Sequence, residues 1–248
     1  MLIDTAILLA AGQGSRLRSI DSCKPLCPVA GKPLIDHAIE RLADAGLGRV
    51  IVVTGFQAER IEAHVAARPW PLLVETVRTG DWRQPNGVSA LAAGARLDNA
   101  AALLAMCDHV VDVEVYSRAA LAGAGDGLTL CIDRRLDHPW VDADDVTCVR
   151  TDQSRIVAIG KGLRPYDAHD MGVFAVGPAF FRALDDIAGA SVTDAVQSLA
   201  RHKAAGTIDC SDLDWIDVDD EVALRKAEGW LAAPSHPGSL PILSAAAR

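Results

Sequence analysis

Residues 8–18, LLAAGQGSRLR, and the pair Lys24 and Pro25 just after them decide the fold that we expect for this chain. The preceding segment, residues 3–9, is almost continuously apolar and predicts a short strand buried on both faces of a parallel sheet. The chain then breaks into small residues that include Gly12 and Gly14. Such a loop lets backbone N–H groups approach an anion closely, which favours a phosphate site.

Three cations follow the loop closely, namely Arg16, Arg18 and Lys24. A strand, a loop of small residues and clustered cations together predict a site for a polyphosphate. The dinucleotide fingerprint is excluded because Leu17 stands where its third glycine belongs, and the Gly-Lys-Ser/Thr of a P-loop is absent. The alternative is an ordinary turn between strand and helix with exposed cations.

The composition is that of a globular α/β protein. The chain has 248 residues, of which 50% are hydrophobic, so it can bury a sizeable core. A net charge of −9 argues against nucleic acid or an anionic membrane as the main partner. We find neither a signal peptide nor an apolar stretch as long as a membrane span, and we expect six reduced cysteines in the cytoplasm.

Strands and helices alternate through the first half of the chain. The predicted strands are residues 3–9, 50–53, 72–77 and 101–106, and the predicted helices are residues 34–42, 58–67, 86–95 and 115–122. This order indicates an α/β fold with a doubly wound, mostly parallel, Rossmann-like sheet covered by helices on both faces. Ligands of such sheets bind at the carboxyl ends of the strands.

The pattern changes after residue 128. Residues 146–150 and 155–159 flank a polar turn and predict a hairpin, and residues 129–133 and 171–176 predict further strands. Strands without intervening helices suggest a small antiparallel flap on the substrate side.

We therefore predict one domain over residues 1–231. Residues 1–127 would form its nucleotide-binding half and residues 128–231 its substrate and metal half. Residues 232–248, with three prolines, read as an irregular tail without a membrane helix.

Asp108 follows the strand at residues 101–106 and should lie at the same sheet edge as the glycine loop. A carboxylate there can bind nucleotide phosphates through Mg²⁺. The alternative role is a helix N-cap. Asp112 is at least as good a cap for the helix through Val115, which leaves Asp108 free for the metal.

The string from Leu9 to Leu17, followed by Lys24-Pro25-Leu26, resembles the signature of the sugar-nucleotide pyrophosphorylases, with Ser15 in place of the commoner threonine. The resemblance implies a GT-A-like nucleotidyltransferase fold in which Arg16 holds the leaving pyrophosphate and Lys24 the α-phosphate. It also implies a set of nucleotide-binding residues: Leu9, Ala10, Ala11, Gly12, Gly14, Ser15, Asn86, Gly87 and Asp108. Asn86 and Gly87 would lie beside the base, or form only a turn that starts a helix.

The same resemblance implies metal and acceptor sites in the second half. Asp217 matches the second metal carboxylate in a Trp-x-Asp motif, so Asp108 and Asp217 would hold Mg²⁺, with Asp219 as the alternative to Asp217. Lys161 would meet the substrate phosphate, or be only a solvated lysine. Asp170 and Gly172 complete the implied substrate site.

Later motifs narrow the resemblance to the CTP:inositol-1-phosphate cytidylyltransferases, over roughly residues 3–231. They are residues 106–110, MCDHV; 156–163, IVAIGKGL; 170–174, DMGVF; and 215–219, WIDVD. Cys107 departs from the family, which usually has glycine there. The family often fuses this domain to a membrane phosphotransferase.

The implied reaction joins a nucleoside triphosphate, CTP by resemblance, to a phosphorylated alcohol, inositol 1-phosphate by resemblance, and releases pyrophosphate. We expect the product to pass to a separate phosphotransferase, and a homodimer is among the assemblies compatible with the sequence. The alternatives are transfer to another sugar, cyclitol phosphate or phosphonate, and a non-catalytic nucleotide-binding regulatory protein.

Overall fold

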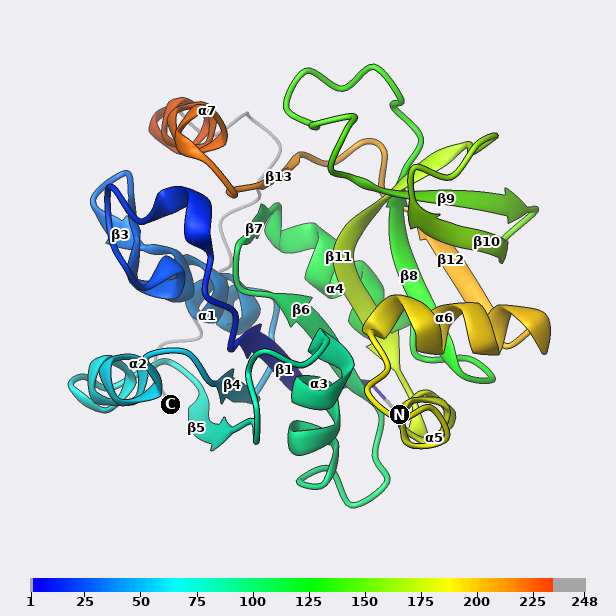
Figure 1. Cartoon of the computed structure of the whole chain (residues 1–248), viewed down its shortest axis with the longest axis horizontal. Coiled ribbons are helices and arrows are strands. Elements are labelled where there is room, and N and C mark those ends of the chain that lie inside the picture. Colours follow the sequence, from blue (N-terminus) through cyan, green and yellow to red (C-terminus); the bar gives the residue numbers. More distant parts are fainter. Residues whose placement is uncertain (1, 234–248) are drawn as a thin grey trace, which may run out of the picture.

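A mixed sheet of nine strands forms the centre of the molecule (Figure 1). The computed structural model describes residues 2–233, and the predicted tail lies almost wholly outside them. The strand order is β5-β4-β1-β6-β11-β8-β12-β10-β9. Strands β5, β4, β1 and β6 run parallel, and β11 then enters antiparallel to both β6 and β8. The predicted α/β class with a Rossmann-like parallel part is confirmed.

The elements follow the predicted alternation closely. The strands of the large sheet are β1 (Thr5–Ala10), β4 (Arg49–Thr54), β5 (Leu73–Arg78), β6 (Ala102–Met106), β8 (Leu128–Asp133), β9 (Thr147–Asp152), β10 (Arg155–Lys161), β11 (Ala168–Val176) and β12 (Ala205–Asp209). The α-helices are α1 (Leu34–Asp44), α2 (Ala58–Ala66), α3 (Asn86–Gly94), α4 (Val113–Ala122), α5 (Pro178–Asp185), α6 (Val192–Arg201) and α7 (Glu221–Ala232). Asp112 caps α4 through the N–H of Glu114, as expected.

Strand β1 is buried on both faces because its side chains alternate between two apolar clusters. Ala6 and Leu8 pack into one cluster, and Ile7 and Leu9 into the other. A strand in this position needs apolar residues throughout, which is the reason for the continuous run in the sequence.

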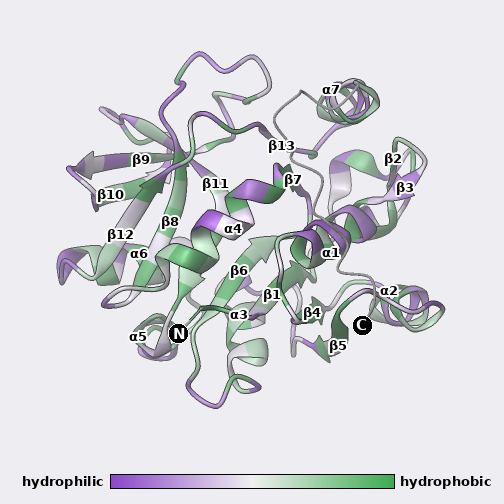
Figure 2. Ribbon diagram, turned by 180° about the vertical axis from the view of Figure 1, so that it is seen from behind, coloured by the Kyte–Doolittle hydropathy of each residue, from purple (hydrophilic) through white to green (hydrophobic). Residues whose placement is uncertain are grey.

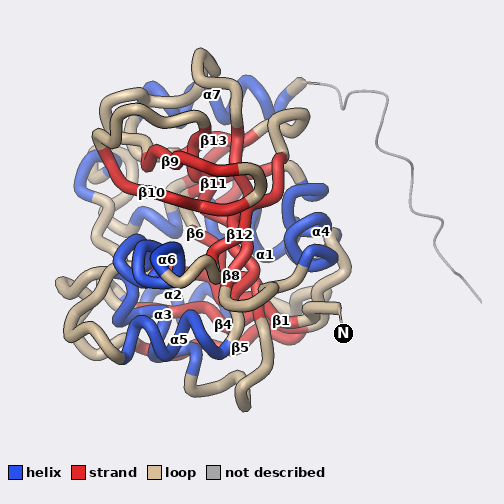
Figure 3. Tube along the Cα trace, turned by 90° about the vertical axis from the view of Figure 1, so that its right-hand side faces the viewer, coloured by secondary structure: helices blue, strands red, loops and turns tan. Residues whose placement is uncertain are grey.

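Helices cover both faces of the sheet (Figures 2 and 3). Helices α1, α2 and α4 pack in the cluster that contains Leu8, and α3, α5 and α6 pack in the cluster that contains Ile7. Figure 2 shows the central strands β1 and β6 largely green, whereas α4 carries both green and purple stretches, the pattern expected of a helix with one buried face.

The second half continues the sheet instead of forming a separate layer. The hairpin of β9 and β10 turns at Gln153, as predicted, but it joins the far edge of the sheet through β12 and also pairs with β11. Strand β12 is parallel to β8 and was not predicted, because its residues are small and mixed. The expected flap is therefore the far edge of one continuous sheet.

Two short strands bring residues 215–217 to the site. Strand β13 (Trp215–Asp217) pairs antiparallel with β7 (His109–Val111), and Asp217 lies opposite His109. Ile216 and Val218 are buried in a third apolar cluster with Leu17 and Leu224. Asp217 therefore points the other way, as its alternation with Ile216 and Val218 predicts.

The remaining short elements are the β-ribbon of β2 (Pro28–Val29) and β3 (Lys32–Pro33) and two 3-10 turns, η1 (Ser15–Leu17) and η2 (Lys24–Leu26). Among residues 2–233, no helix is long and apolar enough to cross a bilayer.

Candidate active site

Two cavities lie beside the carboxyl ends of the parallel strands. The smaller, of about 220 Å³, is lined by Leu9, Ala10, Gly12, Gly14, Lys24, Pro25, Leu34, Cys107, Asp108 and Asp219. The larger, of about 490 Å³, extends from Arg16 and Asp108 to the hairpin of β9 and β10 and to the start of α7. Asp108 and Asp219 line both cavities, so they stand where a nucleotide site would meet an acceptor site.

The glycine loop forms one wall of the smaller cavity, as its sequence predicts. Gly14 has a φ of 56°, and a Cβ on it would lie 2.4 Å from Cβ of Lys24. Glycine is needed there for both its conformation and its lack of a side chain. Ala11 is buried in the core and Ser15 is exposed, and neither residue lines the two cavities described above.

Lys24 is a buried cation held among three carboxylates. Its side chain is only 7% exposed, and its Nζ lies 2.6 Å from Asp108, 3.9 Å from Asp217 and in contact with Asp219. Burial opposes its charge, but the three carboxylates outweigh burial and raise the pKa of Lys24 above its ordinary value. Lys24 is therefore a permanent positive charge at the junction of the cavities.

Asp108 and Asp217 approach each other across the β7–β13 pair. His109 Nδ1 donates a hydrogen bond of 3.0 Å to Asp108 and lies 3.8 Å from Asp217. Its ring stacks on Trp215 with an interplanar angle of 15°. Burial disfavours the charged imidazole, but Asp217 and Asp108 outweigh it and raise the pKa of His109 to about 9. Burial raises the pKa of Asp217 to about 7.

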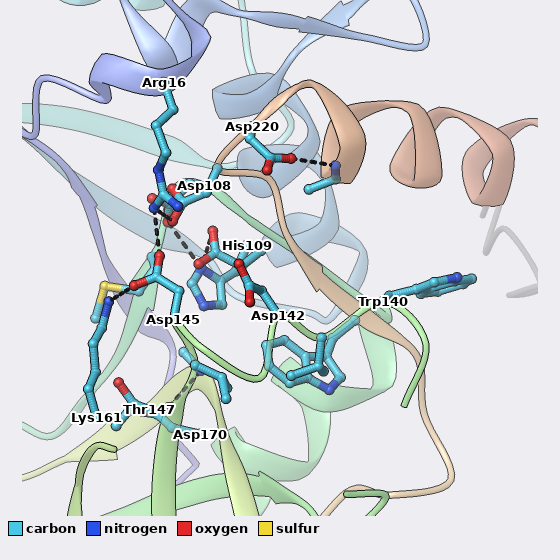
Figure 4. Close-up of a pocket in the computed structure, with 18 of the residues that line it drawn as sticks. Arg16, Asp108, His109, Trp140, Asp142, Asp145, Thr147, Lys161, Asp170 and Asp220 are labelled. Carbon is cyan, nitrogen blue, oxygen red and sulfur yellow. Dashed lines mark hydrogen bonds and ion pairs between the residues drawn. The ribbon is translucent and has the colours of Figure 1, made fainter. Parts of the chain in front are cut away.

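Arg16 and Lys161 point into the larger cavity, where one carboxylate bridges them (Figure 4). Asp145 accepts from Arg16 at 2.6 Å and from Lys161, and Arg16 also contacts Asp219. Two alternatives for Lys161 follow from the sequence, a ligand of the substrate phosphate or a solvated side chain. In the structure Lys161 lines the larger cavity. Hydrogen bonds from Lys161 and Arg16 lower the pKa of Asp145 to about 2.

Asp170 and Gly172 lie at the floor of the larger cavity on β11, where the strand's register shifts. Asp170 accepts a 2.7 Å hydrogen bond from the N–H of Gly172, and burial raises the pKa of Asp170 to about 6. Gly172 has a φ of 73°, and a Cβ there would lie 2.5 Å from the ring of His109. Gly172 thus makes room for the imidazole that contacts both Asp108 and Asp217.

Asn86 and Gly87 begin α3 and have structural contacts of their own. Asn86 lines the larger cavity, and its side chain accepts from the N–H of Val192. Gly87 is buried against the carbonyl of Ala190, which a Cβ would approach to 2.3 Å. Packing alone therefore requires glycine at position 87, and the role of Gly87 beside a base stays a prediction.

Cys107, which stands where the resembling family usually has glycine, is buried beside the smaller cavity. Its N–H donates to the carbonyl of Leu9, and it belongs to the core cluster of Leu8. Burial raises the pKa of its thiol well above the ordinary value, so the side chain is a neutral, apolar part of the wall.

Comparison with known proteins agrees with this geometry. Residues 6–149 match the MobA-like NTP transferase domain, and this segment contains the glycine loop, Lys24, Asp108 and Asp145. The chain belongs to the family of MobA-like NTP transferase domains. The likeness to nucleotidyltransferases inferred from the loop is thereby confirmed.

Two curated relatives from different organisms share one name. The chain is 34% identical over 237 residues to a bifunctional IPC transferase and DIPP synthase of Rubrobacter xylanophilus, covering 92% of this chain and 53% of that protein. It is 27% identical to a protein of the same name from Aquifex aeolicus, covering 96% of this chain and 54% of that one. The chain thus spans about half the length of these relatives.

A solved structure shows the same fold. The inositol-1-phosphate CTP transferase of T. maritima superimposes with a TM-score of 0.83 over 92% of this chain and 95% of that one, at 19% identity. The GT-A-like nucleotidyltransferase architecture is confirmed at this level.

The residues at the β7–β13 pair fit a divalent cation. Asp108, His109 and Asp217 offer ligand atoms within 4.8 Å of one another, and Oδ1 of Asp217 is buried without a hydrogen-bond partner. Two carboxylates beside an open cavity are the donors that Mg²⁺ takes when substrate phosphates supply the remaining oxygens. Asp219, the alternative ligand, contacts Lys24 and Arg16 instead.

Sequence reasoning missed His109 and Asp145 as site residues. His109 adjoins Asp108 on the predicted edge, so its position could have been noticed. Asp145 lies in the polar segment between β8 and β9, where nothing local distinguishes it from Asp142 or Asp144. Only the long-range contact with Arg16 reveals it.

Proposed function

We propose that this chain is a nucleotidyltransferase that joins CTP to inositol 1-phosphate and releases CDP-inositol and pyrophosphate. The observation that carries the proposal is the meeting of buried Lys24 with Asp108, Asp217 and Asp219 where the two cavities adjoin. A binding protein needs affinity for phosphate, whereas this arrangement puts charges of both signs where a phosphoryl group would be transferred.

The choice of CTP and inositol 1-phosphate rests on the relatives. The solved T. maritima structure is an inositol-1-phosphate CTP transferase, and two curated relatives are named IPC transferase and DIPP synthase. The larger cavity offers carboxylates that can accept hydrogen bonds from ring hydroxyls, namely Asp142 and Asp170, beside the cation Lys161. These groups suit an acceptor with several hydroxyls and one phosphate.

In the proposed reaction, an oxygen of the acceptor phosphate attacks the α-phosphorus of the triphosphate in line. The bond between the α-phosphorus and its bridging oxygen breaks, and pyrophosphate leaves with the electron pair. The attacking phosphate is already ionised at neutral pH, so no strong general base is needed. Lys24 would stabilise charge at the α-phosphate, Arg16 would hold the leaving pyrophosphate, and Lys161 would orient the acceptor phosphate.

Asp108 and Asp217 would hold the Mg²⁺ that this proposal includes. When bound, the ion would neutralise charge that develops on the triphosphate. Lys24 and His109 offset the negative charge of the two aspartates in its absence. Gly172 contributes by leaving space for His109.

The cellular setting follows from the same proposal. All six cysteines are free and buried, which suits the reducing cytoplasm. A product of this kind, an alcohol activated by a nucleotide, would be consumed by a separate phosphotransferase. A homodimer is one assembly compatible with this proposal, and the mass of the protein in solution tests it.

The test is pyrophosphate release from each of four nucleoside triphosphates combined with a panel of acceptors, in the presence of Mg²⁺. We expect CTP with inositol 1-phosphate to be the best pair, with discrimination against wrong acceptors of roughly a hundredfold, because buried polar groups left unpaired are costly. Preference for another base or for a hexose 1-phosphate would contradict the proposed substrates, CTP and inositol 1-phosphate. It would still support nucleotidyl transfer as the reaction.

Variants separate catalysis from binding. Arg16→Ala and Asp217→Asn should each reduce turnover by about a hundredfold or more. The first removes a cation that would stabilise the leaving pyrophosphate, and the second removes the negative charge that would hold Mg²⁺. Asp144→Asn, an exposed aspartate outside both cavities, serves as the control. If the protein binds a nucleotide but releases no pyrophosphate with any pair of triphosphate and acceptor, the alternative function, a non-catalytic nucleotide-binding regulatory protein, is favoured.

A further inference from the structure

The carboxylate of Asp145 bridges the two cations that the proposed reaction assigns to substrate phosphates. Two cations of the larger cavity, Arg16 and Lys161, come from distant parts of the chain, and both bind its side chain. Arg16 adjoins the glycine loop and Lys161 ends β10. A phosphate oxygen is the other ligand for which such a pair of cations is suited.

Asp145 differs in its anchoring from the other carboxylates of the site. Asp217 is fixed by the β7–β13 pair, the carbonyl of Asp108 accepts from the N–H of Val218, and Asp219 contacts the buried Lys24. Asp145 lies in the segment of residues 134–146, which joins β8 to β9 and contains no strand or helix. Its side chain is 30% exposed, so it can turn toward solvent without being buried elsewhere.

The segment that carries Asp145 forms part of the wall of the larger cavity. Val141, Asp142 and Val146 line the same cavity, and Figure 4 shows Asp142 and Asp145 there. The carbonyl of Pro139, in the same segment, accepts a hydrogen bond from Lys226 on α7. The backbone contacts around Asp145 are turns within the segment, such as that between the N–H of Val146 and the carbonyl of Asp142. A rotation of the Asp145 side chain therefore breaks no sheet pairing.

We propose that Asp145 is an internal substitute for the substrate phosphate groups, which holds Arg16 and Lys161 in place in the free enzyme and is displaced when phosphate groups bind to these cations. The inference rests on the proposed function for the identity of the phosphate compound that binds. The competition between Asp145 and a phosphate for the two cations does not depend on that function. Asp145 is thus a positioning and specificity residue. It lowers affinity for lone anions, and only a ligand with enough other contacts displaces it.

The pairing has a definite consequence for binding. Asp145 stays ionised at neutral pH, since Lys161 and Arg16 lower its pKa to about 2. A phosphate must therefore compete with a full negative charge. Within residues 2–233, removal of that charge frees Lys161 and leaves Arg16 paired with Asp219 alone. Anion affinity should therefore rise, which is opposite to the effect expected of a residue that binds the ligand.

The experiment measures binding of inorganic pyrophosphate by calorimetry, without metal or nucleotide. Asp145→Asn should bind pyrophosphate about fivefold more tightly than the wild-type chain, the scale of one or two partly exposed ion pairs. Asp144→Asn is the matched control, since it makes the same charge change one residue away without contacting a cation. In a Lys161→Gln background, the gain from Asp145→Asn should shrink.

Other results would overturn the inference. Weaker or unchanged binding by Asp145→Asn would mean that Asp145 orders the cations for the ligand or plays no part. An equal gain in Asp144→Asn would indicate a general effect of net charge. Asp145→Ala and a melting curve for each variant exclude loss of folding as the cause. Because the readout is pyrophosphate binding, a chain that fails to transfer cytidylyl groups could still confirm the displacement.

Discussion

Lys24 shows how one residue can serve both stability and chemistry. Its charge offsets Asp108, Asp217 and Asp219, while its aliphatic stem packs on Gly14. A buried cation among carboxylates is costly to remove, because the partners are left uncompensated.

We expect Lys24→Met to lower the free energy of unfolding by about 3 kcal/mol and to reduce turnover by orders of magnitude. Mg²⁺ should recover part of the lost stability, since a bound cation would replace the missing charge. Urea unfolding with and without Mg²⁺ measures both effects. Lys32→Met is the control, because Lys32 forms a partly exposed pair with Glu40 and its loss should cost under about 1 kcal/mol. Equal losses in the two variants would contradict the role of Lys24.

Asp170 should make stability depend on pH. Burial raises the pKa of Asp170 to about 6, above the value of about 3.9 for the unfolded chain. Between these values the folded state binds more protons than the unfolded state, so the contribution of Asp170 to stability falls as pH rises to about 7.

Asp170→Asn should therefore melt at nearly the wild-type temperature near pH 4 and several degrees higher at pH 8. The amide oxygen can still accept from the N–H of Gly172. Asp167→Asn should behave in the opposite way. Hydrogen bonds from Thr151 and Arg134 outweigh burial and lower the pKa of Asp167, so the variant should lose stability at pH 8. Parallel pH profiles for the two variants would argue against this account.

Helix α3 meets the segment before α6 at one glycine. A Cβ on Gly87 would lie 2.3 Å from the carbonyl oxygen of Ala190 and 2.5 Å from Leu184. Asn86 beside it accepts from the N–H of Val192 at the start of α6. The first turn of α3 thus fixes the position of α6, which contributes Val192 and Thr193 to the larger cavity.

Gly87→Ala should destabilise the protein by about 1–3 kcal/mol, because the contact with Ala190 can be relieved only by moving backbone. Gly229 provides a matched control within α7, where a Cβ would meet nothing within 4 Å. Gly229→Ala should stabilise by about 0.5–1 kcal/mol, as alanine loses less entropy in a helix. Chemical denaturation measures the free energy of unfolding of both variants. An unchanged free energy of unfolding in Gly87→Ala would show that α3 can move away from Ala190 at no cost.

The nucleotide and acceptor halves share one sheet. Strand β6 pairs with β1 on one side and with β11 on the other, so the first half ends in a strand whose partner comes from the second. We propose that residues 1–231 fold as one cooperative unit.

A fragment of residues 1–127 should therefore aggregate or remain unfolded, because β6 would become an open, apolar edge. The full chain should unfold in one urea transition, with tryptophan fluorescence and circular dichroism coinciding. Tryptophans report from both halves, at positions 70, 82, 140, 215 and 230. A soluble, cooperatively folded fragment would show that the first half is a separate domain.

The local sequence by itself determined the glycine loop, the alternation of strands and helices, and the outward direction of Asp217 beside Ile216 and Val218. These features follow from backbone conformation and from periodicity over a few residues, so nearby residues suffice to predict them. Tertiary structure decided which distant charges meet. The bridge from Asp145 to Arg16 spans 129 positions, and the contact of His109 with Asp217 depends on the pairing of β7 with β13. Which ionic groups pair depends on the strand order of the sheet and on the loops that connect its strands. No local sequence pattern encodes these pairs, so only the folded chain reveals them.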